Sequence, residues 1–421
     1  MSTLRQLRNF WKPWVATMVL FCLSDAVAQT SYIVTDLGTL NKDENLSCAM
    51  ALNNYGWTLS MNGLLDPFSD SIAGKLVKGR AAINIGEFKI DLGTLGGQNS
   101  WMNWGAINDR AQAVGFSETS VLDPNGEDFC GFGTGLTCRP FLWQDGHMSA
   151  LPTAGGNNGS ASDINNSGQI AGYAQTNVTD SGCPPYQTTA AVLWEKGKVQ
   201  ILPTVGSDPD GVAFGINDQG QAVGYSGTCT SANHAVSWAN GTAFALPDLG
   251  MGAIAQEVNN QGQIVGIIGS ADGTTEYAAV WQNGTLINLG TLPGDFAAIG
   301  TGINNRGQVV GSTLDSNFNW AHAFIWQNGV MTDLNTLFPG SSNLFATMAN
   351  KINERGQISG MATVLTGPHA GQEIHAFLAT PVNASVGKSV ADVARTRPTI
   401  TLPANVGKQL LQRLRFGRLE R

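Results

Sequence analysis

Acidic and aromatic residues are concentrated in a few stretches that depart from the otherwise regular pattern of this chain. Asp123, Glu127 and Asp128 lie within residues 118–137, and Tyr186 lies in a similar stretch further along. Two carboxylates that converge in one pocket can supply a general acid and a general base, which is the chemistry of polysaccharide hydrolases and lyases. Acids and aromatic rings on a surface can equally bind a ligand without turnover, and the sequence leaves both alternatives open.

Other patterns of catalytic or metal-binding residues are weak. Of the five histidines, His234, His322 and His375 share one position of a repeated motif, so we expect each to hydrogen-bond to the backbone. The chain has no G-x-S-x-G nucleophile elbow and no cysteine or histidine spacing typical of zinc sites. We therefore predict no cofactor, no metal ion and a non-enzymatic protein. A hydrolase or lyase that uses the loop carboxylates is the alternative.

The stretch "INNRGQVVG" (303–311) resembles a calcium loop or a phosphate-cradling turn when it is read alone. A calcium loop needs carboxylates at alternate positions, where this stretch has Asn, Arg and Gln. Asn304 can hydrogen-bond to the backbone ahead of it, and Gly307 can adopt a positive φ, so we interpret the stretch as a structural turn. It is one of seven related copies, which begin at residues 52, 107, 164, 216, 258, 303 and 352.

These copies have a mean spacing of 50 residues, which is typical of propeller blades. Each repeat contains four short segments with strand-like alternation, but the last copy lacks its final segment. That segment stands before the first copy, as "YIVTDLGTL" (32–40). Because a small four-stranded sheet cannot bury both faces, successive sheets must stack. We predict an all-β, seven-bladed β-propeller of four-stranded blades, closed by residues 32–40 pairing beside 375–380. An open β-solenoid is the main alternative.

The order of the motifs resembles a known family. The pattern IN-x-x-GQ-x-x-G, followed by HAF-x-W-x-x-G and DLGTL, resembles the HAF-repeat family of predicted extracellular repeat proteins. The HAF tripeptide is present at 322–324 and 375–377, whereas residues 234–236 and 139–141 depart from it. The resemblance covers residues 32 to about 381. It implies export and a repeat architecture, and it implies no catalytic residues.

The two ends of the chain lie outside the repeats. Residues 1–28 have the basic start, short apolar run and small residues of a signal peptide, with an uncleaved anchor as the alternative. We predict the propeller over 29–382 and a basic tail, partly helical or disordered, over 383–421. The amphipathic part of the tail (405–419) could associate with an anionic surface, dock on the ring or stay disordered. We expect no transmembrane segment in the mature chain.

The cysteines are informative because export implies an oxidising compartment. We predict a disulfide between Cys130 and Cys138, which are close in one loop. A bond between Cys183 and Cys229 is a second pairing that the sequence leaves open. Cys48 lies in an apolar strand pattern, so we expect a buried thiol.

Departures from the repeat point to a candidate binding surface. The residue three positions before the start of each "IN" motif is Ala or Gly, except in the second copy, where it is Trp104. Together with Trp101, this residue could plug the central channel or present an aromatic surface to a ligand. The loops at about 62–79, 118–137 and 175–188 are longer than their equivalents. Long loops over a rigid ring often carry binding residues, although drift in tolerant surface loops explains them equally well.

The charge of the chain limits its partners. Residues 29–382 hold 28 acidic and 12 basic residues, and an acidic body of this kind repels nucleic acid. We therefore expect a secreted, periplasmic or cell-surface protein that binds an extracellular protein or glycan. The expected binding residues are Trp101, Trp104, Asp123, Glu127, Asp128 and Tyr186.

Overall fold

The chain forms an all-β structure. A computed structural model describes residues 30–65, 76–102, 107–183, 186–317, 319–368 and 370–382. The predicted signal peptide and basic tail lie outside these residues. Within them, the regular elements are strands and one short 3-10 helix, η1 (Leu334–Leu337). The prediction of an all-β protein is confirmed.

Most strands belong to five antiparallel sheets of four strands, each in chain order, and each corresponds to one repeat. The first is β6 (Gly96–Trp101), β7 (Ala113–Leu122), β8 (Leu136–Gln144) and β9 (His147–Ala150). The second is β10 (Gly155–Ile164), β11 (Ile170–Thr179), β12 (Gln187–Glu195) and β13 (Lys198–Ile201). The third is β14 (Asp210–Ile216), β15 (Ala222–Thr228), β16 (Ser231–Ala239) and β17 (Thr242–Ala245). The fourth is β18 (Ala253–Val258), β19 (Ile264–Gly269), β20 (Glu276–Gln282) and β21 (Thr285–Gly290), and the fifth is β22 (Ala297–Ile303), β23 (Val309–Leu314), β24 (Trp320–Gln327) and β25 (Val330–Asp333).

The remaining eight strands form one sheet that joins the two ends of the repeat region. It contains β2 (Leu46–Leu52), β3 (Thr58–Leu65), β4 (Leu76–Ile85) and β5 (Phe88–Asp91) from the first repeat, and β26 (Leu344–Ile352), β27 (Ile358–Val364) and β28 (Ile374–Val382) from the last. A single parallel pair, Leu46 with Ile374, connects the two sets. β1 (Ser31–Gly38) pairs antiparallel with β28, with Ile33 opposite Thr380. The N-terminal segment thus supplies the strand that the last repeat lacks.

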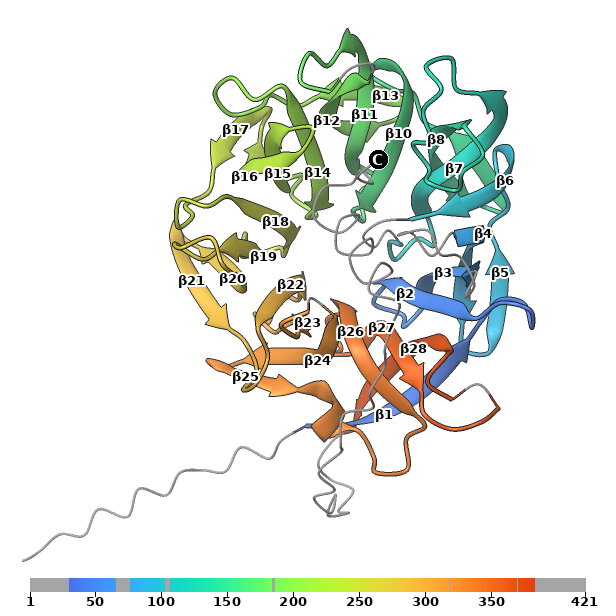
Figure 1. The fold of residues 1–421 in the computed structure, drawn as a ribbon, viewed down its shortest axis with the longest axis vertical. Helices are drawn as coiled ribbons and strands as arrows, with labels where there is room; N and C mark the ends of the chain where they lie inside the picture. The colour runs from blue at the N-terminus through green and yellow to red at the C-terminus, as the bar shows by residue number, and fades with distance from the viewer. Residues whose placement is uncertain are drawn as a thin grey trace, which may run out of the picture.

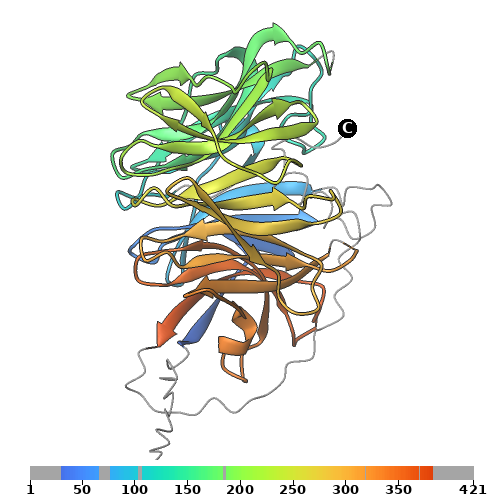
Figure 2. The ribbon, with the colours of Figure 1, turned by 90° about the vertical axis from the view of Figure 1, so that its left-hand side faces the viewer.

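The sheets follow one another around a common centre, as in a β-propeller (Figure 1). In the sheets labelled β10–β13 through β22–β25, the first strand lies nearest the centre and the fourth at the periphery. The strands run through the thickness of the disc (Figure 2). The turns between first and second strands therefore meet near the axis on one face of the disc, which we call the turn face.

The innermost strands share a β-bulge shortly before their ends. The register shifts between Ala161 and Asp163 in β10, and at the equivalent place in β2, β14, β18, β22 and β26. Small residues precede the bulge because neighbouring sheets crowd there. A Cβ on Gly300 would lie 2.5 Å from Cγ2 of Val265 in the preceding sheet. Trp104, which breaks this size rule, lies outside the described residues.

Tryptophans fill the space between neighbouring sheets. Trp194, Trp238 and Trp281 are fully buried. The indole Nε1 of each donates, over 2.7 Å, to a proline carbonyl that follows the last strand of the preceding sheet. Trp143 is also buried, and Trp326 packs against the core while partly exposed. The repeated tryptophans therefore hold adjacent sheets together.

Candidate functional site

The repeated turn has a structural role in every sheet, as the sequence predicts. In the turn after β22, the side-chain Oδ1 of Asn304 accepts hydrogen bonds from the backbone N–H groups of Arg306 and Gln308, both at 3.1 Å. Gly307 has a φ of 71°, a conformation in which other residues are strained. Asn304 is buried, so its side chain replaces water as the partner of these backbone groups.

The same asparagines also connect neighbouring turns, which the sequence did not reveal. The Nδ2 group of Asn304 donates to the backbone carbonyl of Asn353, and that of Asn353 donates to the carbonyl of Asn53. The equivalent bonds link 53 to 108, 108 to 165, 165 to 217, 217 to 259 and 259 to 304. These seven bonds form a closed cycle around the axis.

A second cycle lies beside the first, at the residue that follows each of these asparagines. The backbone N–H of Asn305 donates to the Glu354 carboxylate, and that of Glu354 donates to Oδ1 of Asn54. The remaining members are 54 to 109, 109 to 166, 166 to 218, 218 to 260 and 260 to 305. Three of the acceptors are carboxylates, so the rim of the turn face is both polar and negatively charged.

These turns surround a hollow of about 150 Å³ on the axis, which we call the axial hollow. Its lining includes the paired asparagines, the three acidic residues of the second cycle (Asp109, Asp218 and Glu354) and three further charged residues, Asp163, Glu257 and Lys351. Each of these last three directly precedes the "IN" motif, and so follows the β-bulge. Lys351 Nζ donates to the Glu257 carboxylate. Asp163 accepts the backbone N–H groups of Ile164 at 2.9 Å and Ile216 at 3.0 Å, and the second of these bonds reaches the next sheet.

The three charges perturb one another. Burial raises the pKa of Glu257 to about 7, although the ammonium of Lys351 opposes this shift, and the Asp163 carboxylate adds to it. Burial likewise raises the pKa of Asp163. Burial alone would lower the pKa of Lys351, but the two carboxylates raise it above its usual value. Besides the carboxylates of the surrounding turns, the hollow therefore presents a protonated ammonium and two further carboxyls, and the pKa of one of these, Glu257, is raised to about 7.

Sequence reasoning missed these charged residues, although a signal was present. The residue directly before the motif is small in four copies, at 51, 106, 215 and 302, and charged in three. The glycines have a steric reason: a Cβ on Gly215 would lie 3.0 Å from Cα of Glu257, and one on Gly302 would lie 3.1 Å from Cα of Lys351. Charged and small residues thus alternate from sheet to sheet over the last five copies.

An exposed aromatic side chain belongs to one of the turns that surround the axial hollow. Tyr55 follows Asn54, which lines the hollow, and 65 % of the tyrosine is exposed. Its ring centroid lies 6.2 Å from that of Trp57. The other six copies have Gln in the position of Trp57, and that Gln accepts a hydrogen bond from the motif asparagine in all six. The first repeat exchanges that bond for a pair of aromatic rings.

The loop acids that the sequence singled out are interior residues. Asp123 and Glu127 are buried, and both accept from the side chain of Asn158 on β10, at 2.7 and 3.4 Å. Glu127 also accepts from Gln175 on β11 at 2.5 Å. The two carboxylates do converge, but around an amide that fixes the β7–β8 loop to the next sheet. The prediction of an exposed binding surface is therefore corrected for these two residues.

Of the other predicted binding residues within the described structure, one is buried and two are half-buried. Trp101 is 4 % exposed, because its ring packs edge-on against Phe132, so its expected aromatic surface is also corrected. Asp128 and Tyr186 are half-buried, and Asp128 accepts the backbone N–H of Gly133. A binding role for these two stays a prediction.

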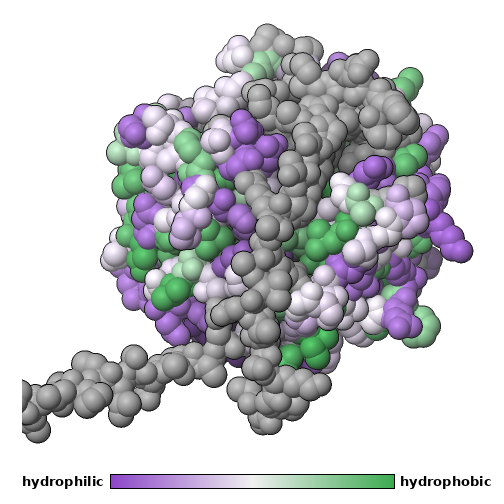
Figure 3. Space-filling view, turned by 60° about the horizontal axis from the view of Figure 1, so that its bottom comes forward, coloured by the Kyte–Doolittle hydropathy of each residue, from purple (hydrophilic) through white to green (hydrophobic). Residues whose placement is uncertain are grey.

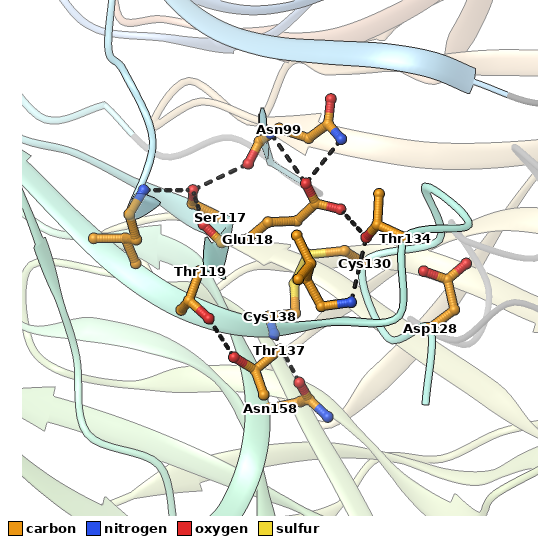
Figure 4. Close-up of a disulfide and its surroundings, with 12 residues drawn as sticks. Asn99, Ser117, Glu118, Thr119, Asp128, Cys130, Thr134, Thr137, Cys138 and Asn158 are labelled. Atoms are coloured by element: carbon orange, nitrogen blue, oxygen red, sulfur yellow. Dashed lines mark hydrogen bonds between the residues drawn. A yellow bond between two sulfur atoms is a disulfide. The ribbon is translucent and has the colours of Figure 1, made fainter. Parts of the chain in front are cut away.

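The structure contains the predicted disulfide between Cys130 and Cys138 and also the one between Cys183 and Cys229, and Cys48 is a buried free thiol. Figure 4 shows the first disulfide beside Glu118. The buried Glu118 carboxylate accepts hydrogen bonds from Asn99 and Thr134, which also stiffens this loop.

The repeated histidines bind carboxylates, which are partners that the sequence did not suggest. His234 Nδ1 lies 2.8 Å from the Asp208 carboxylate, and His322 Nδ1 lies 2.7 Å from that of Asp295. His375 contacts Asp36 of β1 in the same manner. The sequence did not suggest these acids because they come from loops and from the displaced N-terminal strand, where the repeat pattern is weakest. In each pair the carboxylate occupies Nδ1 and fixes the orientation of the ring.

Comparison with known proteins finds solved structures that align with most of this chain at low sequence identity. No family model and no curated protein matches the chain. Among solved structures, virginiamycin B lyase from Staphylococcus aureus aligns over 83 % of this chain and all of its own, with 9 % identity and a TM-score of 0.48. The β-propeller domain of the Trilobed protease from Pyrococcus furiosus aligns over 86 % and 100 %, with 8 % identity and a TM-score of 0.45. YCF48 bound to D1 peptide aligns over 85 % and 97 %, with 12 % identity and a TM-score of 0.42.

Within the part of the chain that the structure describes, no helix has the length and apolar character needed to cross a membrane. Figure 3 shows hydrophobic residues in small groups among hydrophilic ones over the face that it presents. The exposed hydrophobic residues include Val121, Leu122 and Val178, near the ends of β7 and β11.

Proposed function

We propose that this chain is an exported, closed, seven-bladed β-propeller of the HAF-repeat type that binds an extracellular glycan without transforming it. Seven sequence repeats, the pairing of β1 with β28 and two cyclic sets of hydrogen bonds support the closed ring. A closed ring has no free sheet edge at its ends, which suits a rigid protein that works outside the cell.

The observation that carries the binding proposal is the polar axial hollow, surrounded by turns of which one carries an exposed aromatic side chain. Amides and carboxylates that line the hollow suit the many hydroxyl groups of a sugar. An exposed tyrosine such as Tyr55 offers a flat apolar face together with a polar tip. The volume of about 150 Å³ is below the roughly 300–1,000 Å³ of typical ligand pockets, so the hollow suits only one end of an oligosaccharide.

The burial of the loop acids favours binding over catalysis. A hydrolase or lyase needs its acid and base next to the scissile bond of the substrate. Asp123 and Glu127 are instead buried and bonded to Asn158, so they serve the rigidity of the loop. The alternative is a protein partner bound by the stiff β7–β8 and β11–β12 loops, where Val121 and Leu122 are exposed at the end of β7. The experiment below distinguishes this partner from a glycan.

Export has its own support. Two disulfides in loops, together with an N-terminal segment of the signal-peptide type, are typical of proteins in oxidising compartments. The proposed location is outside the cytoplasm, in the periplasm, at the cell surface or secreted. Fractionation of cells that express the full chain, with N-terminal sequencing of the mature protein, tests this part.

The test of the glycan proposal is an array of bacterial and plant oligosaccharides probed with the mature protein and two variants. Tyr55→Ala removes the exposed ring of the first turn, and we expect it to weaken the strongest signal about tenfold, or ~1.4 kcal/mol. Phe88→Ala is the matched control, because Phe88 is also an exposed aromatic residue, at 77 %, but lies on the peripheral strand β5. If the array retains a glycan that both variants bind as well as the wild type does, the binding site lies elsewhere. The protein partner would be favoured if the array retained no glycan and if Leu122→Asp abolished the capture of a purified surface protein.

A further inference from the structure

The second disulfide connects loops of two neighbouring sheets. Cys183 lies between β11 and β12, Cys229 lies between β15 and β16, and their Cα atoms are 6.5 Å apart. Asp180 begins the first of these loops. Its backbone N–H donates to the carbonyl of Tyr186, and its own carbonyl accepts from the N–H of Cys183. The backbone thus holds Asp180 and Cys183 in a fixed relation.

The Asp180 carboxylate is directed at the disulfide. Its side-chain oxygen and the two sulfur atoms all lie within 4.8 Å of one another. Within the described ranges, this is the one group of three acidic, cysteine or histidine side chains that meets this condition.

One oxygen of the same carboxylate is buried without a hydrogen-bond partner among the described residues. Asp180 is 2 % exposed, and although Oδ1 accepts the N–H of Gly182 at 2.8 Å, Oδ2 is buried and accepts no hydrogen bond from the residues that the structure describes. A buried carboxylate oxygen with no partner is costly, and a cation is the partner that would relieve it. Its position next to two sulfur atoms suggests a cation that binds sulfur and oxygen together.

We propose that reduction of the Cys183–Cys229 disulfide converts this place into a zinc site made of the two thiolates and the Asp180 carboxylate. A dithiol reductant transfers two electrons and two protons to the S–S bond, and becomes a disulfide itself. Zinc then binds the two sulfur atoms and releases both thiol protons to solvent. Water completes the four ligands, as zinc prefers tetrahedral sites with sulfur, nitrogen or oxygen donors.

The geometry requires little movement. A tetrahedral zinc ion with ordinary bond lengths holds its ligand atoms roughly 3.3–3.8 Å apart, which is within the spread of these three atoms once the S–S bond has opened. The zinc ion would bridge the same two loops that the disulfide bridges. The connection between the two sheets would therefore survive a change in redox conditions, with the metal in place of the covalent bond.

The other disulfide provides an internal control. Cys130 and Cys138 also have an acid nearby, Asp128, whose Oδ2 accepts the N–H of Gly133. These three residues do not form a group of ligand distance in the described structure. Reduction should therefore create one zinc site, and not two.

The experiment uses the full mature chain, oxidised or reduced with a dithiol that is then removed without air. Zinc is titrated against a coloured chelator, and cobalt(II) substitution reports thiolate ligation through its charge-transfer absorption. We expect one zinc per reduced chain and none per oxidised chain. The Cys130→Ser/Cys138→Ser variant should keep the site and Cys183→Ser/Cys229→Ser should lose it. Asp180→Asn should weaken zinc at least tenfold while the thiolate band remains.

Alkylation of the reduced wild-type protein provides a second readout that does not depend on a variant folding. Zinc should protect Cys183 and Cys229 from iodoacetamide, and should leave the extent of labelling of the buried Cys130 and Cys138 unchanged, as measured by peptide mass spectrometry. Three results would overturn the proposal. These are zinc bound equally by the oxidised chain, equal labelling of Cys183 and Cys229 with and without zinc, or an Asp180→Asn variant that binds zinc as tightly as the wild type.

Discussion

The cyclic hydrogen bonds predict an unusually large effect for one small substitution, Asn304→Ala. The side chain makes four hydrogen bonds, two within its own turn to backbone N–H groups, one to Gln308 and one to the carbonyl of Asn353 in the next sheet. A typical bond of this kind contributes about 0.5–1.5 kcal/mol, and buried partners that lose it gain no water in exchange. We therefore expect the free energy of unfolding to fall by about 3 kcal/mol, within a range of about 2–4 kcal/mol.

The matched control is the adjacent substitution, Asn305→Ala. Asn305 is half-buried, and as an acceptor in the second cycle it receives one bond, from the N–H of Asn260 at 2.8 Å. Its removal should cost about 1 kcal/mol or less. Equilibrium unfolding in urea, followed by tryptophan fluorescence with the slope of the transition compared between variants, measures both values. Equal losses for the two variants would refute the reasoning, because the buried cycle would then contribute no more than a surface bond.

Three further outcomes follow from the same structure. Deletion of residues 29–40 removes β1 and exposes the edge of β28, so the melting temperature by calorimetry should fall by about 10 °C or more, and an unchanged transition would reject the ring closure. Glu257 has a folded pKa of about 7, above its usual 4.5, so its stabilising contribution is full below about pH 4.5 and is lost as the pH rises through about 7. Urea titrations should therefore show wild-type stability falling more steeply over this range than that of Glu257→Gln, and parallel curves would contradict the assigned burial. Replacement of Cys130 and Cys138 by serine opens a short loop and should lower the free energy of unfolding by about 2–3 kcal/mol, and a loss below about 0.5 kcal/mol would show that the loop needs no covalent closure.

The repeat made much of the fold predictable from sequence. Alternation and turn residues located the strands, and the displaced "DLGTL" segment identified β1 as the partner of β28. The turn around Asn304 was correctly interpreted as structural, because its variable positions tolerate acids, bases and amides. Each of these inferences depends on local chemistry that recurs along the chain.

The candidate site was harder to predict, because it depends on irregularities. A β-bulge places the side chains of Asp163, Glu257 and Lys351 along the axial hollow, and a bulge shifts the alternation from which orientation is inferred. The size rule that the repeats show applies to the position before the bulge, whereas the charged residues stand at the position after it. Trp101 and Glu127 were expected at the surface because they lie in irregular stretches, but non-local contacts bury both. Burial of this kind follows from the packing of neighbouring sheets, which a single sequence does not encode locally.

The measurement that tests the central claim most directly is hydrogen–deuterium exchange of the mature protein with and without a saturating concentration of the retained glycan. Binding at the axial hollow predicts slower exchange in the turns at 53–57, 164–168 and 352–356, with the loops at 121–136 and 178–183 unchanged. Protection confined to those loops would contradict the account and would place the ligand on the opposite face.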